Sequence, residues 1–222
     1  MQKINRAKFY AVYRTKFGPL TQGQVYGLEA LLNSLEADTH IADLRWAAYM
    51  LATAKHETAN TFKPIHEYGS RAYFIARYGS QTKVGKILGN DTPEEGADYA
   101  GRGHAQCTGE NNYQMAESAL RKEYPDVVAR FEARTGKKFD LTVGDQPNDE
   151  TDPDNMMDPE ISYCTMSYAM RTGAFTGVGL PRYINAKGCD YLNARKIING
   201  LDCSKKIANI ATGMEAALRA AA

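Results

Sequence analysis

The chain has 222 residues, and its 27 basic and 26 acidic side chains leave a formal net charge of +1. Apolar residues make up 43% and charged residues 24%, as in an ordinary globular protein, and a chain of this length buries roughly 70% of its unfolded surface. These values exclude collagen-like, disordered and disulfide-scaffold proteins, and they favour one domain, or one domain split into two lobes around a cleft.

The spacing of apolar residues predicts a mainly helical chain. Asp38 offers a cap for the second helix, Pro125 suits the first turn of a helix that ends at Gly136, and Asp158 opens a helix that stops at Gly173. The helices that we expect span residues 22–37, 41–57, 113–124, 125–135, 158–173, 190–199 and 204–221.

Two segments interrupt this pattern. Residues 58–112 are rich in glycine, tyrosine and polar groups, and they have too little periodicity for long helices. Residues 140–158 are acidic and turn-prone, which predicts a surface loop. The aspartates of this loop do not make a calcium site of the EF-hand type, because the glycine and the terminal glutamate of that motif are missing.

Membrane and export signals are weak in this sequence. The longest stretch of apolar and small residues, 46–54, is far shorter than the roughly 20 residues of a membrane-spanning helix. The N-terminus is basic but has no apolar region, so we expect no signal peptide and no stable membrane insertion. The four cysteines form no C-x-x-C pair, which favours reduced thiols in a cytoplasmic compartment.

Charge is distributed unevenly along the chain. Residues 1–22 carry five basic and no acidic side chains, whereas residues 91–160 carry 17 acidic and 7 basic ones. A nucleic-acid-binding protein would have a more dominant basic surface, so we expect no nucleic-acid partner. The basic ends suit either an anionic polymer, such as a bacterial wall, or a solvated charged face.

Two glutamates at the end of the 41–57 helix and just beyond it are candidates for acid–base chemistry. Glu57 lies on the same side of the helix as Thr53 and Ala54, so its carboxyl would be partly desolvated, which favours the protonated form that a general acid requires. Glu67 follows ten residues later and could face Glu57 across a groove. Carboxyls roughly 6.5–9.5 Å apart hydrolyse glycosides with inversion, and a gap of roughly 5 Å implies a covalent intermediate. Solvent-exposed glutamates paired with lysines would fit the same pattern.

Two histidines precede these glutamates, which raises the question of a metal. The metalloprotease pattern H-E-x-x-H would require a histidine at position 60, and Asn60 stands there. We therefore expect no metal and no cofactor, and a structural role for His56.

The segment 99–113 is rich in groups that bind sugars. Gly101 and Gly103 permit a close backbone approach around Arg102, but the sequence lacks the features of a phosphate-binding loop. Hydroxyl and amide groups for sugar hydroxyls, and flat faces for pyranose rings, come from Tyr99, Gln106, Thr108, Asn111, Asn112 and Tyr113. A polar turn before a helix would also explain this composition.

Four ordered motifs together resemble glycoside hydrolase family 19, and most closely its bacteriophage endolysin branch, the peptidoglycan-cleaving relatives of plant chitinases. These motifs are HET at 56–58, Glu67, GRG at 101–103 continuing as QCTGENNY, and RKIING at 195–200. Residues 17–32 and 158–177 also look like segments of those endolysins, so the resemblance covers nearly the whole chain.

The resemblance implies a mainly α, lysozyme-like α+β fold with two helical lobes around a substrate cleft. It implies one catalytic domain over residues 1–222, with residues 58–112 forming much of the cleft and no separate wall-binding domain. Glu57 would be the general acid, Glu67 the base that activates water, and Thr108 a hydroxyl that holds this water. The substrate-binding residues that we expect are Tyr68, Arg102, Gln106, Asn112, Tyr113 and Asn199.

The function that follows is hydrolysis of β-1,4 glycosidic bonds in peptidoglycan by a monomeric phage or prophage endolysin. Such an enzyme would wait in the host cytoplasm and reach the periplasm through a separate holin. The two glutamates are closer in sequence than those of plant chitinases, and the cysteines do not follow the plant disulfide pattern. The alternatives are a chitinase, a non-catalytic peptidoglycan-binding module, and an amidase or peptidase, for which Cys107 with His104 is the one candidate nucleophile.

Overall fold

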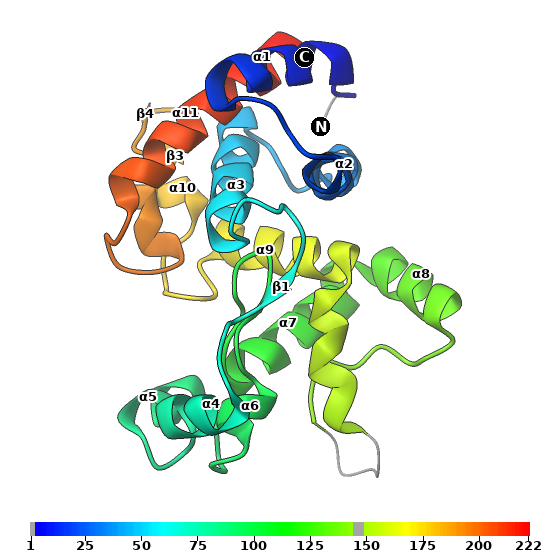
Figure 1. Ribbon diagram of the computed structural model, residues 1–222, viewed down its shortest axis with the longest axis vertical. Helices are drawn as coiled ribbons and strands as arrows, with labels where there is room; N and C mark the ends of the chain where they lie inside the picture. Colours follow the sequence, from blue (N-terminus) through cyan, green and yellow to red (C-terminus); the bar gives the residue numbers. More distant parts are fainter. Residues whose placement is uncertain (1–2, 144–148) are drawn as a thin grey trace. The chain divides into compact units, whose positions relative to one another are not determined.

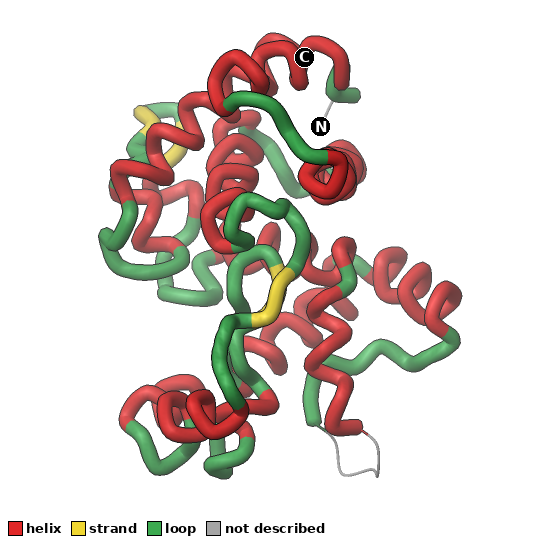
Figure 2. Tube along the Cα trace, in the orientation of Figure 1, coloured by secondary structure: helices red, strands yellow, loops and turns green. Residues whose placement is uncertain are grey.

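The structure of the chain is a computed structural model that describes residues 3–143 and 149–222 (Figure 1). The described part is mainly helical, as the sequence predicts, and its strands form two short antiparallel pairs (Figure 2). The chain divides into two compact units, of which the first comprises Met1–Lys63 and Ala169–Ala222, and the second Pro64–Tyr168.

The first unit is built from both ends of the chain. Its elements are α1 (Arg6–Phe17), α2 (Gln22–Ala37), α3 (Leu44–Glu57), α10 (Leu180–Tyr183), β3 (Ile184–Asn185), β4 (Gly188–Cys189), η2 (Asn193–Ile197) and α11 (Ser204–Ala221). Helix α11 packs against α3 and α1, and the two ends of the chain meet where Asn5 N–H donates to the carbonyl of Ala221 across 2.9 Å (Figure 1).

The core of this first unit surrounds α3. Every residue from Ala47 to Ala54 is buried, and six of these eight are alanine, leucine or methionine, whose side chains pack without polar groups. The sequence predicts an apolar face of α11 made of Ile207, Ile210, Met214 and Leu218. In the structure Ile207, Met214 and Leu218 are buried, Ile210 is half-buried, and Ala211 is buried in its place. This packing fixes α3 along its length and so determines where its last residue, Glu57, lies.

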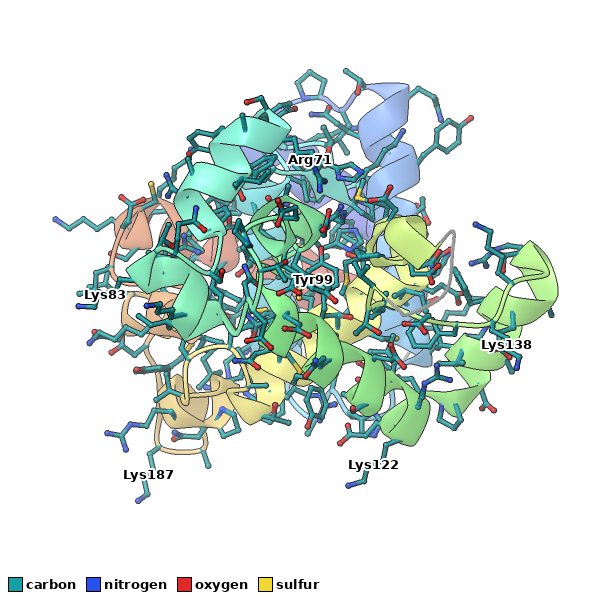
Figure 3. The ribbon with its side chains drawn as sticks, turned by 90° about the horizontal axis from the view of Figure 1, so that it is seen from below. Arg71, Lys83, Tyr99, Lys122, Lys138 and Lys187 are labelled. Carbon is teal, nitrogen blue, oxygen red and sulfur yellow. The ribbon has the colours of Figure 1, made fainter. Side chains whose placement is uncertain are left out.

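The second unit holds the following elements: β1 (Ile65–His66), α4 (Arg71–Tyr78), α5 (Lys83–Leu88), α6 (Glu95–Asp98), β2 (Arg102–Gly103), α7 (Glu110–Glu123), α8 (Pro125–Thr135) and η1 (Asp149–Met157). Helix α9 (Pro159–Thr172) begins in this unit and runs across the boundary at residue 168. Tyr99 lies inside this unit, whereas Lys83, Lys122 and Lys138 point outward (Figure 3).

A close approach of α6 to α4 shapes the second unit near β2. A Cβ at Gly96 would lie 2.5 Å from the amide nitrogen of Gly79 and 2.8 Å from the carbonyl carbon of Tyr78. Only glycine fits this contact, because real Cβ atoms do not come so close to backbone. The contact holds the C-terminal end of α4, and with it Tyr78, against the segment that leads to β2.

The structure confirms several predicted helices and corrects others. Helices α2, α8, α9 and α11 match the expected ranges, but α3 begins at Leu44, since Asp43 and not Asp38 caps it by accepting from the amide of Arg45. Helix α1 has no counterpart among the expected helices. In place of the expected helix 190–199 the structure has only the short 3-10 helix η2. The 3-10 helix η1 occupies part of the expected loop 140–158. Residues 144–148 of that loop lie outside the described ranges.

Within the ranges that the structure describes, no helix combines the length and the apolar character needed to cross a membrane. The four cysteines are thiols, of which Cys107 and Cys164 are buried and Cys189 and Cys203 are exposed.

Candidate functional site

Glu67 in the second unit follows β1 and is held by the backbone of Gly101, the residue just before β2. Strand β1 pairs antiparallel with β2, placing Ile65 opposite Gly103 and His66 opposite Arg102. The next residue, Glu67, donates its amide to the carbonyl of Gly101 across 2.7 Å, and its Oε2 accepts from the amide of Gly101 at 3.4 Å. The main chain and the carboxylate of Glu67 are therefore both tied to one glycine.

Tyr78, the last residue of α4, binds the other carboxylate oxygen. Its hydroxyl donates to Oε1 of Glu67 across 2.9 Å. Burial, together with the neighbouring Glu67 carboxylate, raises the pKa of Tyr78 to about 12. The hydroxyl therefore stays protonated at any physiological pH and acts as a permanent donor, and stacking on Phe74 fixes its ring at a centroid distance of 6.3 Å.

Three polar oxygens converge on Gly101. A Cβ added at this glycine would lie 3.0 Å from Oε2 of Glu67, 3.0 Å from Oε1 of Gln106 and 3.1 Å from Oγ1 of Thr108. Because glycine carries no side chain, the three groups share one small space. The structure thus brings together three residues that the sequence predicts for one site, namely Glu67, Gln106 and Thr108.

The turn between β2 and α7 holds two of these groups in place. Gln106 has a left-handed backbone with φ 53°, and its Nε2 donates to the carbonyls of Ile65 at 3.0 Å and Gly103 at 3.2 Å. Thr108 donates to the carbonyl of Gln106 at 3.0 Å. A non-glycine residue in this backbone conformation is strained and persists only where its surroundings determine it, which is common at functional sites.

Glu57 in the first unit forms an ion pair with Arg195 of η2. The Nη1 of Arg195 donates to Oε1 of Glu57 across 2.5 Å, and its Nε donates to the carbonyl of Asp202 at 3.1 Å. The side chain of Arg195 is 4% exposed and that of Glu57 is 16% exposed. A buried guanidinium needs a partner of opposite charge, so this pair fixes the orientation of the Glu57 carboxylate.

The segment after Glu57 is a tight, strained turn. Ala59, Asn60 and Phe62 have positive φ values of 49°, 68° and 59°. The buried Thr58 stabilises the turn, since its hydroxyl donates to the carbonyl of Ala54 at 2.7 Å and accepts from the amide of Phe62 at 3.0 Å. The helix end that carries Glu57 is therefore held by side-chain hydrogen bonds on its C-terminal side.

His56 has a partly buried environment beside Glu57. Desolvation, with the positive charges of Lys206 and Arg195, lowers the pKa of His56, and the negative charges of Glu57 and Asp202 oppose this effect. His56 is therefore mostly neutral at pH 7. A neutral, partly buried imidazole is compatible with the structural role that the sequence suggests.

Two predicted substrate-binding residues lie in the interior of the second unit instead. Tyr113 is 0% exposed, and its hydroxyl accepts from Nη1 of Arg102 at 3.1 Å and donates to the carbonyl of Ala100 at 2.9 Å. The side chain of Arg102 is 11% exposed and donates to Asp154 across 2.7 Å. Their polar groups are used within the fold, so in this arrangement they support the 99–113 segment and do not present a surface to a sugar. The same correction applies to Tyr99, which is 2% exposed.

The remaining predicted residues lie closer to solvent. Tyr68, next to Glu67, is 83% exposed and offers a flat apolar face. Asn112 is half-buried and donates to the carbonyl of Thr108 at 2.7 Å, which places it beneath the Thr108 turn. Asn199 is exposed in the first unit, and its amide bonds to the carbonyl of Arg195 at 3.0 Å. Tyr68 and Asn199 are thus accessible to solvent, and Tyr68 is the chain neighbour of Glu67.

Two residues that order the glutamates are absent from the predicted site, Tyr78 and Arg195. Tyr78 lies in a segment without a clear helical pattern, so nothing in the sequence indicated its contact with Glu67. Arg195 opens the RKIING motif, and that motif was the one signal that could have singled it out.

The potential metal ligands of the described residues are dispersed, and the thiol of Cys107 is buried. In residues 3–143 and 149–222, no group of three or more His, Cys, Asp and Glu side chains converges on a common point. Burial raises the pKa of Cys107 to about 12, so this thiol is a poor nucleophile at neutral pH.

Comparisons of the chain with protein-family models, with curated proteins and with solved structures found no match.

Proposed function

We propose that the protein is a glycoside hydrolase that cleaves β-1,4 bonds of bacterial peptidoglycan, with Glu57 as the general acid and Glu67 as the general base. The observation that carries the proposal is the convergence of Glu67, Gln106 and Thr108 on Gly101. A carboxylate and a hydroxyl facing one small space are the groups needed to hold and deprotonate an attacking water.

The hydrogen bonds of Glu67 suit a base. A base must be ionised before the reaction, and hydrogen bonds donated to a carboxylate stabilise that charged form. Glu67 receives one such bond from Tyr78 at 2.9 Å and a longer one from Gly101 at 3.4 Å. These donors also aim the carboxylate, which reduces the reorganisation needed when it takes a proton.

The pairing of Glu57 stabilises the form that a general acid takes after it has given up its proton. A general acid gives its proton to the leaving oxygen and becomes a carboxylate, and a nearby cation stabilises the charge that develops. Arg195 stands at 2.5 Å from Oε1 of Glu57 and is held on its other side by the carbonyl of Asp202. The acid must be protonated at the start of each cycle, so the proposal predicts activity that falls at alkaline pH.

The proposed mechanism requires both carboxyls to act on one glycosidic bond. A separation of roughly 6.5–9.5 Å would admit a water on the face opposite the leaving group and give inversion. Tyr68 would stack against a sugar ring, and Asn112 and Asn199 would contact substrate amides or hydroxyls. In the cell, the proposed enzyme acts as a monomeric endolysin that requires a separate holin to reach the wall.

The test is a digest of purified peptidoglycan, reduced with borohydride and analysed by mass spectrometry. We expect new reduced sugar ends, and the mass of the reduced residue identifies which bond is cut. A parallel digest of chitin separates the chitinase alternative, which predicts release from chitin alone. Binding to sacculi without new reducing ends, or release of free peptide amines, would contradict the proposal in favour of a binding module or an amidase.

A further inference from the structure

Asn90, a buried residue just after α5, joins two helix ends through its side-chain amide. It is 3% exposed. Its Nδ2 donates to the carbonyl of Tyr78 at 2.7 Å, and its Oδ1 accepts from the amide of Glu110 at 2.9 Å. A carbonyl can only accept and an amide N–H can only donate, so the two partners fix the orientation of the asparagine amide. One side chain thus links the C-terminal end of α4 to the first residue of α7.

Both partners of this amide are backbone groups at helix ends. Tyr78 is the last residue of α4, and Glu110 is the first residue of α7, whose N-cap Gly109 supplies no side-chain hydrogen bond. The last carbonyls and the first amides of a helix have no partner within that helix. Capping explains why each bond stabilises the fold, but it does not explain why one residue serves both helices.

Close backbone contacts hold Asn90 in this position. Gly89 has a φ of 85°, and a Cβ there would lie 2.4 Å from the side chain of Asn111. Gly109 has a φ of 88°, and a Cβ there would lie 2.4 Å from Cβ of Leu88. In both positions the positive φ and the close neighbour favour glycine. The end of α5 therefore lies directly against the start of α7.

The two helix ends that Asn90 joins carry or adjoin groups of the candidate site. The hydroxyl of Tyr78 donates to Oε1 of Glu67 at 2.9 Å. Glu110 follows shortly after Thr108, whose hydroxyl converges with the Glu67 carboxylate. The Asn90 amide therefore sets the spacing between the donor that aims the carboxylate and the turn that carries the hydroxyl.

We propose that Asn90 is a positioning residue, which holds the donor and the hydroxyl that serve Glu67 at a fixed spacing. It acts through the carbonyl of Tyr78 and the amide of Glu110. The inference rests on the proposed function, in which Glu67 deprotonates a water that Thr108 holds. Such a group of residues is effective only when each member is held close to its productive geometry.

The first test observes Glu67 itself and needs no substrate. Its carboxyl signal in protein labelled with ¹³C-glutamate, assigned with Glu67→Gln, is titrated in wild type, Asn90→Ala and Tyr78→Phe. Loss of a hydrogen bond to a carboxylate disfavours the ionised form, so both variants should raise the titration midpoint by about half a pH unit or more. Asn90→Ala added to Tyr78→Phe should raise it no further, because Asn90 acts on Glu67 through Tyr78.

Asn185→Ala is the matched control for the loss of two amide hydrogen bonds. Nδ2 of Asn185 donates to the carbonyl of Pro181 at 2.8 Å, and its Oδ1 accepts from the amide of Lys187 at 2.9 Å. This is the same pattern of bonds as that of Asn90, but it lies in the first unit. Asn185→Ala should leave the Glu67 midpoint and the hydrolysis rate unchanged.

The second test is kinetic and uses purified peptidoglycan. Asn90→Ala should lower kcat about tenfold with little change in KM, because misplaced groups stabilise the transition state less well. Thermal unfolding checks the fold, and Asn90→Ser, which leaves a smaller cavity, is used for both tests if Asn90→Ala does not fold.

An unchanged Glu67 midpoint in the folded Asn90 variant overturns the inference. So does a shift that adds fully to that of Tyr78→Phe, or an unchanged kcat. Wild-type protein that does not hydrolyse peptidoglycan overturns the proposed function instead, and it leaves the titration result standing.

Discussion

Arg195 and Glu57, which are 138 positions apart in the chain, form a 2.5 Å ion pair that joins η2 to the end of α3. Arg195 is almost completely buried, so Glu57 is both a candidate acid and the partner that makes burial of the guanidinium tolerable. A variant that tests the chemistry must therefore keep an acceptor at position 57. Glutamine does so, because its amide oxygen can still accept from Nη1.

Glu57→Gln tests the assignment of the general acid. We expect the rate of peptidoglycan hydrolysis to fall by about 10² to 10⁴, which is the usual contribution of a positioned acid. Removing one charge of a buried ion pair typically costs about 3–5 kcal/mol of unfolding free energy, so we expect a lower thermal midpoint in a variant that the retained acceptor keeps folded. Clearing of outer-membrane-stripped cells measures the activity, and thermal unfolding measures the fold.

The control for this variant is Glu94→Gln, which neutralises an exposed glutamate at the start of α6. It should leave the clearing rate unchanged. The assignment of Glu57 fails if Glu57→Gln keeps more than about a tenth of the wild-type activity, since no general acid contributes so little.

Gly101→Ala tests the convergence of oxygens that carries the proposed function. Its Cβ would press on Glu67, Gln106 and Thr108 at 3.0–3.1 Å, so these groups must shift by a few tenths of an ångström. Because a misplacement of about 1 Å costs on the order of a hundredfold in rate, we expect the smaller shift to lower the rate by about tenfold. Gly101 does not have a positive φ, so the alanine backbone is unstrained, and we expect unchanged or slightly higher stability. Steady-state hydrolysis and the thermal midpoint, measured on the same preparation, give both quantities.

Gly188→Ala, in the exposed strand β4, is the matched control because its Cβ meets nothing within 4 Å. It should change neither quantity. Full activity in Gly101→Ala would show that the groups around Gly101 have no part in catalysis.

The helices could be predicted where a local signal marks both ends. Thr21 forms a capping box that opens α2, and Pro125 and Gly136 bound α8 at the expected residues. Helix α1 carries no acidic residue and only an irregular apolar pattern, with Phe9, Tyr10 and Tyr13 buried, so periodicity does not reveal it. Its stability comes from packing on α11, which is a tertiary effect.

The candidate site, like the helices, can be predicted only where a local sequence signal marks its residues. The chemistry of Glu67, Gln106 and Thr108 and the short motifs that contain them predict that they share one site, and the structure brings the three together at Gly101. Arg195 and Tyr78 act through contacts with distant residues, and no spacing rule encodes such contacts. The opposite error occurred at Tyr113, where a residue type suited to sugars is buried to satisfy Arg102.

Tyr78→Phe tests the donor that holds Glu67. The variant keeps the ring stacked on Phe74 and removes the hydroxyl, so we expect a stability loss of about 1 kcal/mol and a fall in kcat of about tenfold. Because the pKa of Tyr78 is about 12, its ionisation contributes no alkaline limb to the pH profile of the wild type below that value. Tyr73→Phe, which removes an exposed hydroxyl bonded to Arg77, should keep full activity, and equal losses in the two variants would argue against a specific role of Tyr78.

The lowered pKa of His56 predicts how stability depends on pH. The folded state holds the neutral imidazole, whereas the unfolded chain takes up a proton near the ordinary histidine pKa of about 6.5. As pH falls below that value, the unfolded state binds more protons than the folded state, so unfolding becomes easier until the pH reaches the folded pKa. Below the folded pKa both states are protonated, and this contribution stays constant.

His56→Gln removes this proton difference. Urea unfolding at pH 7, 6 and 5 should therefore show a smaller loss of unfolding free energy in His56→Gln than in wild type. The slope of unfolding free energy against pH should differ between the two proteins by an amount that corresponds to at most one bound proton. Lys206→Gln keeps the histidine but removes one of the charges that lower its pKa, so it should give an intermediate slope. Identical slopes in wild type and His56→Gln would mean that His56 binds its proton equally well in both states, which its burial beside Arg195 argues against.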